Sequence, residues 1–185
     1  MSISSILTKR SALTALLTAS LVTIAAGSNA ETTAEKIARA ITAAPADISD
    51  NATIMDVDLT ILREGTNDWT CLPGVYIYSG NKNPMCNNDT WMRFMAANAA
   101  IEDFSTDTVG ISYMLAGEYV GDNANSMANV PDNGGVWVPD GAQMMMVFPS
   151  MDTVPNLPRD ENAGGPWVMW ANTPYAHVMI PIVPK

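Results

Sequence analysis

The sequence predicts an α+β fold, in which about two helices accompany a mainly antiparallel sheet and one disulfide. Two stretches, residues 31–44 and 89–99, carry apolar side chains at helical spacing. Five or six other stretches have the length and the apolar or alternating pattern of strands. Helices and strands do not alternate regularly along the chain, as they would if crossover helices joined parallel strands.

Residues 1–30 have the features of an export signal. Two basic residues precede the apolar stretch 11–26, and small side chains follow at Ser28 and Ala30, as at a signal-peptidase cleavage site. The apolar stretch is shorter than the roughly 20 residues that a membrane-spanning helix needs. We therefore expect a cleaved signal peptide, a periplasmic or secreted location, no membrane span in the mature chain, and a single globular domain over residues 31–185.

Acidic residues dominate the expected mature chain. Removing the leader takes two of the nine basic residues and none of the nineteen acidic ones, so the net charge becomes −12. Such a charge repels phosphate backbones and anionic lipid headgroups. We therefore expect no nucleic acid among the partners, which leaves an unknown small molecule, an envelope component or calcium.

The two cysteines, Cys71 and Cys86, are expected to form a disulfide, because their number is even and the chain is exported. Closing a loop of about 15 residues stabilises the fold by roughly 3 kcal/mol. The pair lacks the C-x-x-C spacing of redox motifs, and no histidine lies nearby to complete a zinc site.

The first elements are a helix and a strand. The helix covers residues 31–44, with Ile37 and Ile41 four apart, and stops before Pro45. Residues 55–61 then alternate apolar and polar side chains, which predicts a strand with one wet face.

A turn at residues 64–68 leads to a returning strand at 69–73, which carries the first cysteine. Asp89 or Thr90 can cap the second helix, which continues to residue 99. The disulfide would therefore tie the end of a strand to the start of this helix.

The C-terminal half is predicted to be mostly strands and loops. Residues 109–120 and the apolar run 144–148 are strand-like, and long loops are expected at 121–135 and 149–166. The chain ends in a hairpin, in which residues 167–171 and 175–183 pair around Asn172, Thr173 and Pro174.

The only histidine, His177, lies in the second strand of this hairpin. Side chains alternate along a strand, so His177 shares a face with Tyr175 and Met179, and a three-residue loop places Met169 opposite it. Three interpretations remain: a structural histidine, a residue of a binding or catalytic site, or a metal ligand. Its isolation from any second histidine favours the structural interpretation.

Asp56 and Asp58 lie on one face of the strand predicted at residues 55–61. With Glu64 or Asp68 nearby, they could form a carboxylate cluster for calcium or for acid–base chemistry. The simpler interpretation is that they form the solvent side of an amphipathic strand, because the alternation already requires polar residues there.

Other patterns do not predict a metal or cofactor site. The loop 121–135 fails the calcium-loop register, because Ala124 occupies a ligand position. The twelve mature methionines raise the possibility of copper(I), but the consecutive residues 144–146 alternate between strand faces and cannot present three sulfurs to one ion. Trp167 and Trp170 also fall on opposite faces, so at least one should be buried.

Several segments resemble a family of small exported bacterial proteins. The segments are LREGTNDWTCLP (62–73), NPMCNNDTWM (83–92), GISYML (110–115) and GGPWVMWANTPYAHVMIP (164–181), and they occur in the family's order. The resemblance implies a periplasmic or secreted protein and implies no activity. Family members have a Gly-Pro-His step before the methionine-rich strand, whereas residues 140–143 here are Asp-Gly-Ala-Gln. Any two-histidine site is therefore absent.

The leading hypothesis is an exported, non-enzymatic binding or envelope-associated domain, with Trp170, Tyr175 and His177 beside the ligand pocket. It rests on the dense aromatic hairpin and on the lack of a catalytic motif. One alternative is a small hydrolase that uses His177 with a carboxylate among Asp56, Asp58 and Glu64. A second alternative is a calcium-stabilised structural protein.

Overall fold

The structure is a computed structural model that describes residues 30–77, 80–116, 119–121, 138–154 and 156–182. The chain divides into two units, Met1–Ala30 and Glu31–Lys185. The expected signal peptide, apart from Ala30, and the predicted loop 121–135, apart from Gly121, lie outside the described residues. Within the described ranges, no helix is long and apolar enough to span a membrane.

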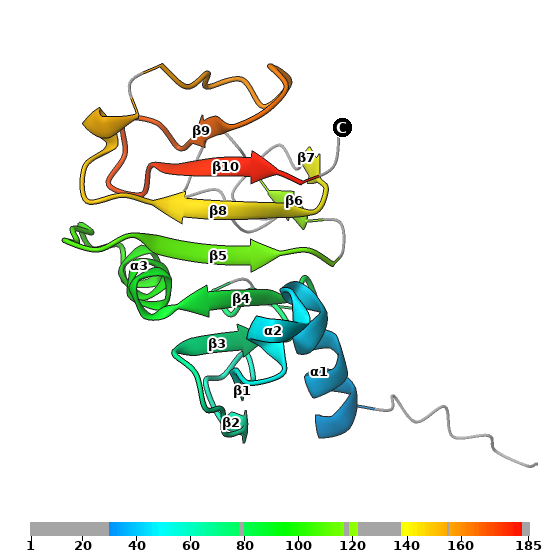
Figure 1. The fold of residues 1–185 in the computed structure, drawn as a ribbon. Helices are drawn as coiled ribbons and strands as arrows, with labels where there is room; N and C mark the ends of the chain where they lie inside the picture. The colour runs from blue at the N-terminus through cyan, green and yellow to red at the C-terminus, as the bar shows by residue number, and fades with distance from the viewer. Residues whose placement is uncertain (1–29, 78–79, 117–118, 122–137, 155, 183–185) are drawn as a thin grey trace, which may run out of the picture. The chain divides into compact units, whose positions relative to one another are not determined.

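An eight-stranded sheet forms the centre of the second unit, in the order β2-β1-β3-β4-β5-β8-β10-β9 (Figure 1). Its strands are β1 (Thr53–Met55), β2 (Ile61–Arg63), β3 (Trp69–Leu72), β4 (Met85–Asn88), β5 (Gly110–Met114), β8 (Gln143–Val147), β9 (Trp167–Met169) and β10 (His177–Pro181). Only the β1–β3 pair is parallel in this sheet. A separate pair, β6 (Tyr119–Gly121) and β7 (Val138–Asp140), is antiparallel. The predicted α+β class with a mainly antiparallel sheet is confirmed.

Both predicted helices are present, and the structure adds a short helix that was not predicted, α2 (Ala46–Ser49), after Pro45. The first predicted helix is α1 (Thr33–Ala40), which continues into a 3₁₀ turn (Ile41–Ala43), and a capping box between Thr32 and Glu35 starts α1. The second is α3 (Asp89–Ala100), whose cap is Asn88 rather than the predicted Asp89 or Thr90, since the Asn88 side chain accepts a hydrogen bond from the Trp91 amide. A further 3₁₀ turn covers Met151–Thr153.

The strand predicted at residues 55–61 is wrong, because β1 ends at Met55, β2 begins at Ile61, and residues 56–60 form the turn between them. The Asp56 amide donates to the Thr60 carbonyl (2.8 Å), and the Leu59 amide donates to the Asp56 carbonyl (2.9 Å). The Asp56 carboxylate also accepts from the next amide in the chain, and the Asp58 carboxylate accepts from the Thr60 amide (3.0 Å). Aspartates that bond to nearby backbone amides favour turns, and this local bonding overrides the alternating pattern.

Apolar side chains of this turn and of the first residue of β2 face solvent, contrary to the pattern that suggested burial. Val57, Leu59 and Ile61 are 41%, 45% and 46% exposed. Leu59 has φ = 66°, in the left-handed region that non-glycine residues seldom adopt. The strand predicted at 109–120 is also interrupted, since β5 ends at Met114 and β6 starts at Tyr119.

The predicted disulfide joins Cys71 and Cys86, which face each other across β3 and β4. Both cysteines are fully buried. Asn88, the cap of α3, lies two residues after Cys86, so the bond fixes the start of that helix to the sheet as predicted.

The sheet separates two hydrophobic clusters. The alanines of the first helical stretch cover Ile54, Cys71 and Cys86 on one face. The other face carries Leu72, Met85 and larger side chains, which pack against α3 and the C-terminal hairpin. Adjacent residues such as Cys71 and Leu72 belong to different clusters because side chains alternate along a strand.

Candidate functional site

The C-terminal hairpin pairs β9 with β10 and places His177 opposite Met169, as predicted. Trp170 (φ = 53°) and Asn172 (φ = 66°) both have left-handed backbone conformations in the connecting turn. The Thr173 hydroxyl donates to the Trp170 carbonyl (2.8 Å) and so closes the turn. At this turn Trp170 leaves the strand alternation, and both it and Trp167 are buried.

His177 is buried at the centre of an aromatic cluster, with 2% of its surface exposed. Its ring centre lies 5.3 Å from that of Trp91, 5.5 Å from that of Phe94 and 5.0 Å from that of Trp170, in edge-to-face arrangements. Nδ1 is 2.9 Å from the Tyr175 carbonyl oxygen. A carbonyl only accepts hydrogen bonds, so Nδ1 carries the proton and Nε2 has the free lone pair.

Burial lowers the pKa of His177 to about 4, against the smaller opposing effect of the hydrogen bond to the Tyr175 carbonyl. The imidazole is therefore neutral near pH 7. A general base works best when its pKa lies near the working pH. This environment suits a structural histidine or a neutral ligand better than a general base.

Tyr175 joins the hairpin to the C-terminal end of α3. Its ring centre is 6.3 Å from that of Phe94, and its hydroxyl donates to the Glu102 carbonyl (3.0 Å). Burial raises its pKa, and the carboxylates of Asp103 and Glu102 add to the effect. The tyrosine is therefore a neutral tether between the hairpin and the helix.

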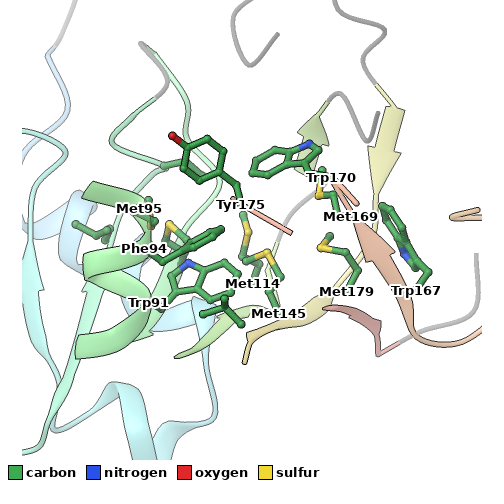
Figure 2. Close-up of a cluster of buried hydrophobic side chains, with 14 residues drawn as sticks. Trp91, Phe94, Met95, Met114, Met145, Trp167, Met169, Trp170, Tyr175 and Met179 are labelled. Carbon is green, nitrogen blue, oxygen red and sulfur yellow. The ribbon is translucent and has the colours of Figure 1, made fainter. Parts of the chain in front are cut away.

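The inner side of the hairpin borders a small apolar cavity beneath α3. Figure 2 shows the methionine and aromatic side chains of this region. The cavity is lined chiefly by five methionines and by the rings of Trp91, Phe94, Trp170 and His177; the methionines are Met85, Met95, Met114, Met145 and Met169. Its volume is about 40 Å³. A benzene-sized ligand needs a cavity of roughly 150 Å³, so this one holds an ion or a very small group.

The outer side of the hairpin borders a larger groove of about 390 Å³. Its aliphatic lining includes Leu157, Val168 and Ala176, and its charged residues are Asp152 and Arg159. Both charged residues are exposed, and neither side chain forms a hydrogen bond or ion pair within the described parts of the chain. Small-molecule sites usually have volumes of about 300–1,000 Å³, so the groove has the size of a ligand site and the inner cavity does not.

The three binding residues predicted from the sequence, Trp170, Tyr175 and His177, are brought together by the hairpin. All three are buried, and Trp170 and His177 line the inner cavity. The outer groove is lined instead by neighbours on the same hairpin, such as Asn172, Thr173 and Ala176. These groove residues carry no sequence motif, and only the position of residues 151–154 and 156–159 beside the hairpin identifies them.

The structure does not bring His177 near the acidic candidates. Asp56 and Asp58 lie in the β1–β2 turn, and β10 is five strands away from β1 in the sheet order. At about 4.8 Å between strands, the separation is roughly 24 Å. Asp56 instead pairs with Lys36, which lies on α1.

The other acids that the structure describes form no cluster typical of a metal site. In the part of the chain that the structure describes, no three His, Cys, Asp or Glu side chains are grouped so that they could hold a metal ion.

Comparison with known protein families, curated proteins and solved structures finds no match to this chain. The geometry of the hairpin is therefore the basis for proposing a function.

Proposed function

We propose that this protein is an exported, non-enzymatic binding domain that holds a small zwitterionic molecule in the outer groove of its C-terminal hairpin. The observation that carries the proposal is a ligand-sized groove with an aliphatic lining and two opposite charges that do not pair with described residues. The ligand's carboxylate would bind Arg159, and its ammonium group would bind Asp152.

The rest of the molecule supports a binding role over the two alternatives. The hydrolase hypothesis needs a carboxylate beside His177, but the acidic candidates lie at the other end of the sheet. The calcium hypothesis needs grouped oxygen ligands, and the described acids are not grouped in that way. The disulfide and the lack of a spanning helix among the described residues are compatible with an exported protein.

The roles of the predicted binding residues differ in this proposal. Trp170, Tyr175 and His177 do not line the groove. Tyr175 and His177 pack against rings of α3, and Trp170 packs against His177, so the three hold the hairpin in place from its inner side. Val168 and Ala176 present the opposite face of the same hairpin to the groove. A rigid hairpin keeps the binding surface formed before the ligand arrives, which reduces the entropy lost on binding.

The test is calorimetric titration of the disulfide-bonded protein with a panel of L-amino acids and glycine betaine. We expect at least one of these zwitterions to bind, and Arg159→Gln or Asp152→Asn to weaken its affinity at least tenfold. Lys82→Gln is the matched control. Like Arg159, Lys82 is exposed and positively charged, but it does not line the groove. The proposal is wrong if no zwitterion binds, or if the Lys82 variant loses as much affinity as the Arg159 variant.

A further inference from the structure

The hydrophobic cluster beneath α3 is unusually rich in methionine. Six of its fourteen buried members are methionines, only one is leucine and none is isoleucine. The cluster on the opposite face contains no methionine. Methionine loses more side-chain entropy on burial than leucine or isoleucine, and it specifies packing less well. Stability alone therefore gives little reason to gather thioethers on one face.

The strand order brings these thioethers together from distant parts of the sequence. Met145 on β8 faces Met179 on β10, and Met169 on β9 faces His177 on β10. Met114 on β5 lines the same cavity as Met145 and Met169. Figure 2 shows methionine sulfur atoms between the rings of α3 and those of the hairpin.

The donors around this cavity are soft and uncharged. Both cysteines are held in the disulfide, so thioethers are the soft sulfur donors that remain. Thioether and imidazole ligands favour copper(I) and similar soft ions, whereas calcium and magnesium require oxygen ligands. A volume of about 40 Å³ accepts a bare ion but not one that keeps its hydration shell.

His177 has the arrangement that metal-binding histidines commonly show. Its Nδ1–H donates to a backbone carbonyl, which fixes the ring and leaves the Nε2 lone pair available. Nε2 has no hydrogen-bond partner in the described ranges. The nearby rings of Trp91 and Trp170 can also stabilise a cation through their π faces.

We propose that the inner cavity binds one soft monovalent cation, copper(I) or silver(I), through the sulfurs of Met114, Met145 and Met169 and through Nε2 of His177. Met95 is not included, because its sulfur already accepts a long hydrogen bond (3.9 Å) from the Asn87 amide group. The site is separate from the outer groove, so either proposal can fail without the other. The three methionines and His177 are at most 5% exposed, so the ion would be shielded from competing water.

The test uses silver(I) nitrate in chloride-free buffer, because silver(I) needs no reductant and leaves the disulfide intact. Calorimetry and native mass spectrometry of the disulfide-bonded protein should give one silver ion per chain. Met145→Leu with Met169→Leu should weaken binding at least tenfold, since leucine has a similar volume but no sulfur. The matched control is the double variant Met144→Leu with Met146→Leu. Met144 and Met146 lie on either side of Met145 in β8, so their side chains point to the opposite face of the sheet, and they are less buried.

A second measurement does not depend on the stability of a variant. In the unmodified protein labelled at its methionine methyl groups, silver(I) should shift the NMR signals of Met145 and Met169 and leave those of Met144 and Met146 in place. The proposal is overturned if silver(I) does not bind. It is also overturned if both leucine pairs weaken binding equally, or if only the signals of the more exposed methionines shift.

Discussion

The neutral state of His177 predicts that the protein loses stability between pH 6.5 and pH 4. The folded protein holds this imidazole at a pKa of about 4, below the ordinary value of 6.5. The unfolded chain therefore binds a proton first as the pH falls, and each pH unit in this window lowers the free energy of unfolding by about 1.4 kcal/mol. The full loss is about 3 kcal/mol. Above about pH 7.5 the histidine contributes almost no pH dependence, because it is neutral in both states.

The assay is urea unfolding of the tag-free protein at several pH values between 7.5 and 4, together with that of His177→Asn. Asparagine keeps a side-chain donor for the Tyr175 carbonyl but does not titrate. Carboxylates affect both proteins alike, so the difference between their free energies of unfolding isolates the histidine. We expect this difference to shrink by about 3 kcal/mol across the window. Parallel curves would refute the burial of a neutral His177.

Three further predictions concern the scaffold. Replacing both Cys71 and Cys86 with serine should lower the free energy of unfolding by about 3 kcal/mol, measured as a shift in the urea midpoint; an unchanged midpoint would contradict the disulfide. Gly110→Ala should destabilise by roughly 1–3 kcal/mol in the same assay, because its Cβ would lie 2.5 Å from Cγ1 of Val147 on the neighbouring strand β8; a neutral effect would argue against this close packing. Leu59→Asn should leave the free energy of unfolding unchanged or raise it by up to about 1 kcal/mol, because asparagine tolerates the left-handed backbone of this position better than leucine does. A lower melting temperature would count against the assigned turn.

Local sequence features predicted much of the scaffold because they depend on short-range interactions. The register of His177 opposite Met169 follows from the length of one hairpin loop. The disulfide follows from two cysteines in a chain that the sequence predicts to be exported, and its bond lies across neighbouring strands. The error at residues 55–61 has a local cause as well, since the carboxylates of Asp56 and Asp58 bond to turn amides.

The two sites on the hairpin could not be predicted, because they depend on the order of strands in space. The three consecutive methionines at 144–146 cannot bind one ion together, because their side chains alternate between the two faces of β8 as the sequence predicted. Met145 instead meets Met179 because β10 lies between β8 and β9 in the sheet. Likewise, Arg159 lines the groove because its part of the predicted loop 149–166 lies beside the hairpin, and the sequence predicts the loop but not where it lies.

The most direct test of the proposed function is an amide NMR titration of the protein with the amino acids of the panel. We expect the shifted signals to belong to residues around the outer groove, such as Asp152, Arg159, Val168 and Ala176. A titration that leaves these signals unchanged, or that shifts only signals in the β1–β2 turn, would contradict it.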